Sequence, residues 1–135
     1  MLVDDDDPTN FLQEKILRLS GCTENIRVFE DALQALDYLS KSLDPERNGP
    51  YYQKPDLILL DINMPRVNGW DFIEEYLKHS ENKKDGVIIM MLTTSLNPDD
   101  REKAGAIHEI SGFYTKPLTL EMLEAILEKH FPDNL

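Results

Sequence analysis

The stretch LILLDINMP, at residues 57–65, decides the fold. Its first four residues form a continuous aliphatic run, which is typical of a strand buried on both faces of a parallel sheet. The carboxylate of Asp61 follows this run directly. We therefore expect a central strand over Leu57 to Leu60, with Asp61 at its carboxyl end.

Strand-length apolar runs and helix-length amphipathic segments alternate along the rest of the chain. Further strands are expected at residues 1–3, 26–29, 87–92 and 112–115. Apolar side chains at helical spacing predict helices after Pro8, over 32–43 and 68–79, after Asn97 and after the cap residue Thr119. Because strand and helix alternate five times, the sequence predicts an α/β fold with a parallel sheet covered on both faces.

Two segments carry more specific expectations. Leu12, Ile16 and Leu19 recur at helical spacing, so we expect them to face the core from the first helix. Residues 44–55 hold three prolines, a glycine and two tyrosines. This composition predicts a polar loop, and the order of the elements puts it on the amino-end side of the sheet.

Composition narrows the class of protein. The 135 residues suit one domain, and the net charge of −12 with scattered basic residues argues against a nucleic-acid surface. The single cysteine, Cys22, excludes an intramolecular disulfide, and neither a signal peptide nor a membrane span is visible. We expect a single cytoplasmic domain over residues 1–135 with no output domain, as a monomer or weak dimer that binds neither nucleic acid nor membrane.

Polar residues whose side chains could take part in binding or catalysis lie at the carboxyl ends of four of the expected strands. They are Asp4-Asp5, Asp61, Thr93-Thr94 and Lys116-Pro117. Ligands of open α/β sheets bind beyond the carboxyl ends of the strands. Neighbouring strands lie ~4.8 Å apart, so the carboxylates converge if the first and third strands are adjacent. Either one carboxyl stays protonated or a cation neutralises the group, and an all-oxygen site suits Mg²⁺.

Lys116 would be a fixed counter-charge to these carboxylates and to a transferred phosphoryl group. It precedes Pro117, and a bond of this kind in a tight turn could be cis. The hydroxyl of Thr93 could bond a phosphoryl oxygen, or Thr93 could be a β-branched strand residue with no further role.

Four motifs resemble, in order, those of response-regulator receiver domains. They are Val3-Asp4-Asp5, the run Leu60 to Pro65 with Gly69 after it, Leu92-Thr93-Thr94, and Lys116-Pro117. The resemblance covers nearly the whole chain. It implies a doubly wound, flavodoxin-like (βα)5 sandwich similar to that of the chemotaxis regulators, with a parallel five-stranded sheet in the order 2-1-3-4-5.

The resemblance also implies the metal site and the phosphoacceptor. Asp61 would accept a phosphoryl group from a phosphohistidine. The carboxylates of Asp5 and Asp61 and the backbone carbonyl of Asn63 would bind Mg²⁺ (or Mn²⁺), with Asp4 acting through a water. The run of four aspartates leaves the register open, and direct adjacency to the apolar strand favours Asp4 and Asp5.

The remaining roles concern the phosphoryl group and the signal. Lys116, Thr93 and the backbone N–H of Thr94 would hold the phosphoryl group, although the threonine pair can be read one residue later. Thr93 and Phe113 would form the switch, and Phe113 could equally be a plain core aromatic. The expected partners are a histidine kinase or histidine phosphotransfer protein and a downstream protein target.

Two alternatives to this two-component function stay open. One is an interaction module with the receiver fold and no phosphorylation. The other is a small Mg²⁺-dependent phosphatase of the haloacid-dehalogenase type, which needs a second carboxylate where this chain has Asn63. We expect no enzyme in the ordinary sense, since a receiver domain catalyses only its own phosphorylation and dephosphorylation.

Overall fold

The computed structural model describes residues 1–79, 86–94 and 96–134. The strands are β1 (Leu2–Val3), β2 (Val28–Phe29), β3 (Leu57–Asp61), β4 (Ile88–Thr93) and β5 (Ile110–Thr115). The helices are α1 (Asp7–Ser20), α2 (Ala32–Ser42), α3 (Pro45–Asn48), α4 (Gly69–His79), α5 (Pro98–Ala106), α6 (Leu120–His130) and a final 3₁₀ turn, η1 (Pro132–Asn134). Among the described helices, none has the length and apolar character that crossing a bilayer requires.

The five strands form one parallel sheet in the order β2-β1-β3-β4-β5, which confirms the expected fold class. Val3 pairs with Leu60 across β1 and β3, and Asp61 pairs with Leu92 across β3 and β4. The ends of β1, β3 and β4 therefore lie side by side. This register brings together the polar residues that follow these strands.

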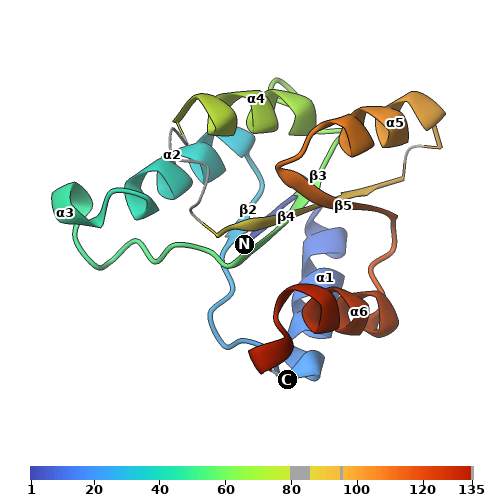
Figure 1. The fold of residues 1–135 in the computed structure, drawn as a ribbon, viewed down its shortest axis with the longest axis horizontal. Coiled ribbons are helices and arrows are strands. Elements are labelled where there is room, and N and C mark those ends of the chain that lie inside the picture. The colour runs from blue at the N-terminus through green and yellow to red at the C-terminus, as the bar shows by residue number, and fades with distance from the viewer. Residues whose placement is uncertain (80–85, 95, 135) are drawn as a thin grey trace.

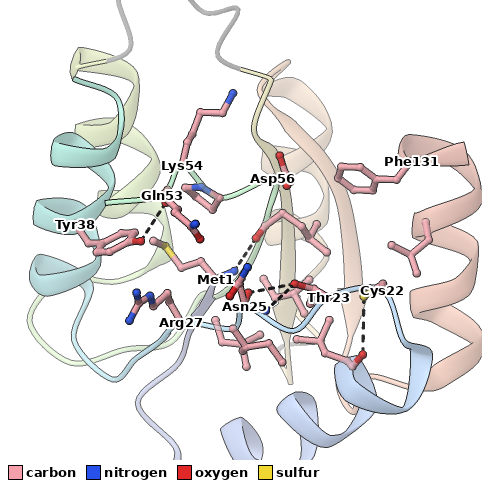
Figure 2. A pocket seen from close by; sticks show the side chains of 17 residues that line it. Met1, Cys22, Thr23, Asn25, Arg27, Tyr38, Gln53, Lys54, Asp56 and Phe131 are labelled. Carbon is pink, nitrogen blue, oxygen red and sulfur yellow. Dashed lines mark hydrogen bonds between the residues drawn. The ribbon is translucent and has the colours of Figure 1, made fainter. Parts of the chain in front are cut away.

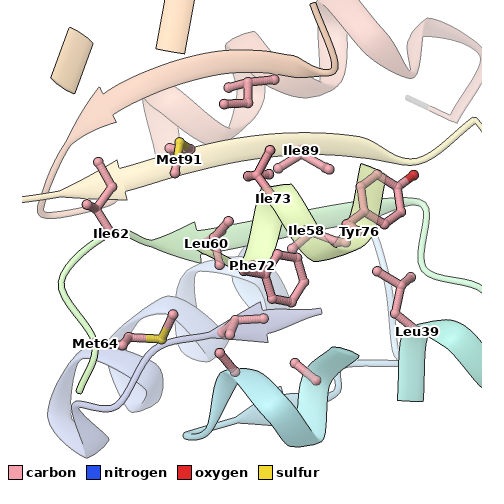
Figure 3. Close-up of a cluster of buried hydrophobic side chains, with 14 of the residues drawn as sticks. Leu39, Ile58, Leu60, Ile62, Met64, Phe72, Ile73, Tyr76, Ile89 and Met91 are labelled. Atoms are coloured by element: carbon pink, nitrogen blue, oxygen red, sulfur yellow. The ribbon is translucent and has the colours of Figure 1, made fainter. Parts of the chain in front are cut away.

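Helices cover both faces of the sheet (Figure 1). Helices α2, α4 and α5 lie on one face and α1 and α6 on the other. Figure 3 shows Phe72, Ile73 and Tyr76 of α4 facing the strand that carries Ile58 and Leu60. The aliphatic run of β3 is buried, as expected for a strand with helices on both sides.

The predicted inward face of α1 is wrong in two positions. Leu12 and Leu19 are 43% and 65% exposed, and the buried residues are Asn10, Gln13 and Leu17. These three also follow helical spacing, one step around the helix. Asn10 donates its side-chain N–H to the carbonyl of Asp4 at 2.8 Å, a bond that orients this face of the helix inward. Periodicity alone does not distinguish two neighbouring faces when both carry leucines.

The segment at 44–55 is more ordered than the predicted loop. It begins with the single helical turn α3, which Asp44 caps through the backbone N–H of Arg47. The ring of Tyr52 lies 5.5 Å from that of Tyr38 on α2, and the Tyr38 hydroxyl donates to the carbonyl of Gln53 at 3.0 Å. The segment is therefore packed against α2, at the opposite end of the sheet from Asp61.

Candidate functional site

Three carboxylates gather at the carboxyl ends of β1 and β3. One oxygen from each of Asp4, Asp5 and Asp61 lies within 4.8 Å of the others. Asp4 follows β1 and is 2% exposed, Asp61 ends β3 and is 6% exposed, and Asp5 faces solvent. The pairing of β1 with β3 produces this convergence, because it places Asp61 beside the residue that follows Val3.

Lys116 reaches the same cluster from the turn after β5. Its Nζ lies 2.5 Å from Asp4 Oδ2 and 3.2 Å from Asp61 Oδ1, and its side chain is 11% exposed. The backbone N–H of Lys116 donates to the carbonyl of Thr93 at 2.8 Å, which ties the turn to the end of β4. The Lys116–Pro117 bond is cis, one of the two forms that the sequence left open.

The charges in the cluster do not balance. Burial and the neighbouring Asp4 raise the pKa of Asp61, and Lys116 and the backbone N–H of Asn63 offset this only in part. Burial by itself would lower the pKa of Lys116, but its hydrogen bond to Asp4 and the charge of Asp61 outweigh burial and raise that pKa. Three carboxylates thus face one ammonium group. The excess negative charge suits a divalent cation with oxygen ligands.

The turn between β1 and α1 fixes Asp4 at several atoms. The backbone N–H of Asp6 donates to Asp4 Oδ1 at 3.0 Å, and the Asn10 side chain donates to the Asp4 carbonyl. Asn10 is 5% exposed, and its Oδ1 has no hydrogen-bond partner among the described residues. Sequence reasoning missed Asn10 because a polar residue one turn into a helix gives no sign of burial. The four aspartates in a row have different places in the structure. Asp4 and Asp5 belong to the carboxylate cluster, and Asp6 is the N-cap of α1.

The backbone after Asp61 packs tightly against the start of α4. The N–H of Gly69 donates to the carbonyl of Ile62 at 2.8 Å. A Cβ at position 69 would lie 2.6 Å from the carbonyl oxygen of Asp61 and 2.9 Å from Ile62 Cα. This close approach explains why glycine follows the Met64-Pro65 turn at this spacing.

The other predicted site residues lie around this cluster. Thr93 ends β4 with no exposed surface, next to Leu92, which pairs with Asp61. Thr94 and Asn63 are exposed beside it. Phe113 lies further back on β5, half-buried, with the guanidinium of Arg101 5.1 Å from its ring centroid.

A separate cavity lies at the opposite end of the sheet from the carboxylate cluster. It has a volume of about 210 Å³, and its lining includes Met1 and Asp56 at the amino ends of strands and Phe131 at the end of α6 (Figure 2). None of the clustered carboxylates lines it. The geometry therefore separates this cavity from the acidic site.

Comparison with known proteins agrees with the fold. The sequence matches the family of response regulator receiver domains over residues 1–128. The chain belongs to this family. Receiver domains as a class bind a divalent metal, and they interact with histidine kinases and downstream targets.

Individual response regulators resemble this receiver domain along nearly all of its length. A two-component response regulator from Cytophaga hutchinsonii has 33% identity and a TM-score of 0.81, covering 97% of this chain and 94% of its own. The response regulator Rcp1 of Synechocystis is 30% identical, over 91% of this chain and 79% of Rcp1. A Mn²⁺-bound structure of Rcp1 has 27% identity and a TM-score of 0.69, covering 95% of this chain and 87% of that one.

Proposed function

We propose that Asp61 is the phosphoacceptor of this receiver domain. The observation that carries the proposal is the position of its carboxylate, buried at the end of β3 and 3.2 Å from the Lys116 ammonium group. A carboxylate held in place beside an ammonium group can attack a phosphorus atom. Phosphoryl transfer depends mainly on positioning and on neutralising charge, and these residues supply both.

In each step of the proposed reaction, one bond to phosphorus forms and one breaks. A carboxylate oxygen of Asp61 bonds to the phosphorus of a phosphohistidine, and the phosphorus–nitrogen bond breaks. The electron pair of that bond stays on the nitrogen, and the imidazole leaves neutral because its other ring nitrogen already carries a proton. Hydrolysis later adds a water oxygen to the phosphorus, breaks its bond to Asp61 and releases inorganic phosphate. Lys116 holds a phosphoryl oxygen through its ammonium group in both steps, because it already reaches Asp61.

A divalent cation completes the site. We propose that the carboxylates of Asp5 and Asp61 and the backbone carbonyl of Asn63 hold Mg²⁺, or Mn²⁺, and that Asp4 acts through a bound water. The excess of carboxylates over ammonium groups supports this donor set. When bound, the cation supplies positive charge against the phosphoryl oxygens. The Mn²⁺-bound Rcp1 structure shows a divalent ion in a receiver-family relative.

Two further residues connect the phosphoryl group to the protein surface. Thr93, with the backbone N–H of Thr94, binds a phosphoryl oxygen, and Phe113 changes the position of its ring in response. Support comes from Thr93, which is buried on the strand beside Asp61, and from Phe113, which is only partly buried. A half-buried ring has two environments available to it, as a two-state switch requires.

The chain acts on itself and on protein partners. We propose that it takes its phosphoryl group from a histidine kinase or a histidine phosphotransfer protein, signals to a downstream protein, and turns over no external substrate. Asn63 stands where a phosphatase of the haloacid-dehalogenase type needs a carboxylic acid, so that reaction lacks its proton donor. An interaction module without phosphorylation would not require Lys116 to pair with two carboxylates.

Phosphorylation by a small donor tests the proposal. The wild type, Asp61→Asn and Asp56→Asn are incubated with acetyl phosphate and either Mg²⁺ or EDTA, and each is weighed intact by mass spectrometry. Asp56 precedes the same strand at its other end, so its variant is a control for the charge change. We expect one added phosphoryl group in the wild type and in Asp56→Asn with Mg²⁺ alone, and none in Asp61→Asn. Equal labelling of Asp61→Asn would refute the assignment.

A further inference from the structure

Helix α5 is attached to the rest of the protein in an unusual way. All nine of its residues are described, and the only buried one is Ala104. By contrast, α6 buries Leu123, Ile126 and Leu127. Since apolar burial holds most helices in place, α5 must depend on other contacts.

One of these contacts is the single tryptophan of the chain. The Trp70 indole N–H donates to Asp100 Oδ1 at 3.2 Å, and the Nζ of Lys103 lies 4.7 Å from the centroid of the ring. Asp100 and Lys103 are three residues apart on α5 and so lie on one side of it. Helix α5 thus contacts the indole at two places, its N–H through Asp100 and its ring face through Lys103.

Trp70 is also joined closely to the acidic site. It follows Gly69, whose N–H bonds the carbonyl of Ile62 and whose α-carbon leaves no room for a side chain beside Asp61. The ring is half-buried and packs against the core under α4. A shift of the segment after Asp61 must therefore move the start of α4 and the indole with it, since packed interiors transmit displacement.

We propose that Trp70 is a positioning residue that couples the phosphoacceptor segment to α5. This inference rests on the proposed function and adds a route for the signal. The route runs from Asp61 through the contact of Gly69 to Trp70, and from the indole to Asp100 and Lys103. It is separate from the path through Thr93 and Phe113, because it leaves the site along the turn after β3.

The two paths meet on the same helix. Arg101 lies next to Asp100 in sequence, and its guanidinium is 5.1 Å from the ring centroid of Phe113. Helix α5 therefore contacts two aromatic rings, one from the phosphoacceptor side and one from β5. An element held mainly by such contacts can take two positions at similar free energy, which is what a signal-dependent surface needs.

Hydrogen exchange of α5 tests the coupling. Exchange of the amides of residues 99–106 is measured with Mg²⁺, with and without beryllofluoride, a mimic of the phosphoryl group. The proteins are the wild type, Asp100→Ala, which removes the acceptor of the indole N–H, Trp70→Phe and Asp99→Ala. Asp99 lies on the same turn and shows no bond to Trp70, so its variant matches the charge change of Asp100→Ala.

We expect beryllofluoride to change the protection of α5 in the wild type and equally in Asp99→Ala. In Asp100→Ala and Trp70→Phe the change falls about twofold or more, the size that mutations along a coupling route commonly produce. Asp100→Ala keeps the indole in the core, so it remains informative if Trp70→Phe unfolds. A purely structural role would alter the baseline exchange and leave the response to beryllofluoride intact, which would overturn the coupling.

Binding of beryllofluoride is followed separately by fluorine NMR. If it does not bind the wild type, the proposed function fails and the coupling fails with it. If it binds the wild type and α5 does not respond, or if α5 responds equally in Asp100→Ala and Asp99→Ala, the coupling alone is wrong.

Discussion

The ionised carboxylate of Asp61 lowers the stability of the folded chain. Burial and the charge of Asp4 raise its pKa above the ordinary value of 3.8. Between that value and the raised one, the folded protein binds the proton more tightly than the unfolded chain does. The free energy of unfolding therefore falls as the pH rises through this range, and the loss is complete above the raised pKa.

Neutralising Asp61 should relieve this cost. Without Mg²⁺, we expect Asp61→Asn to have a larger free energy of unfolding than the wild type at neutral pH, and the difference to shrink as the pH falls toward 3.8. Lys116 keeps Asp4 as a partner in this variant. Urea denaturation from pH 4 to 7 measures the effect. A variant less stable than the wild type at neutral pH would show that the Lys116 pair outweighs the burial of Asp61.

Position 69 has no room for a side chain beside the backbone of Asp61. A methyl group there would lie 2.6 Å from a backbone oxygen, which cannot move without shifting Asp61. We expect Gly69→Ala to cost about 1–3 kcal/mol in the free energy of unfolding, the usual range for overpacking. Gly105→Ala is the control, because nothing lies within 4 Å of its Cβ position. It should leave stability unchanged or increase it by up to about 1 kcal/mol, since alanine favours a helix. Equal effects of the two changes would contradict the close-approach argument.

Helices α5 and α6 differ in how strongly they are held to the rest of the domain, and removing the N-cap of each helix should reveal the difference. Asn97 caps α5 by accepting from the Asp99 N–H, and Thr119 caps α6 by accepting from the Met122 N–H. The two caps are chemically alike. The apolar anchors behind them are not, since α5 buries only Ala104 and α6 buries three large side chains.

We expect Asn97→Ala to increase amide exchange within residues 99–106 and to change global stability little, because α5 can open by itself. Thr119→Ala should lower the global free energy of unfolding by about 1 kcal/mol, since α6 opens only with the whole domain. Hydrogen exchange and urea denaturation distinguish the two outcomes. Equal global losses would mean that α5 is as firmly held as α6.

Some elements are readable from sequence, and others depend on three-dimensional context. The aliphatic run of β3 and the cap at Thr119 are local signals, and both predictions are confirmed. The inward face of α1 depends on a bond between Asn10 and the Asp4 carbonyl, which periodicity does not reveal. The single turn of α3 is too short to produce a periodic pattern.

At the scale of the whole molecule, strand order gathers the site. The polar residues at the carboxyl ends of β1 and β3 are predictable, because each comes directly after an apolar run. Their convergence follows from the order β2-β1-β3-β4-β5, which the family resemblance implied and the structure confirms. The contacts of Trp70 with α5 were not predicted, since they depend on how two helices lie on one face of the sheet.

The measurement that tests the central claim most directly locates the acyl phosphate. The protein is phosphorylated with acetyl phosphate and Mg²⁺, reduced with borohydride and digested, and the peptides are sequenced by mass spectrometry. Borohydride converts an aspartyl phosphate to homoserine and leaves free carboxylates unchanged. We predict homoserine at position 61 alone. Homoserine at position 4 or 5, or a phosphoryl group on a histidine with none at Asp61, would contradict the account.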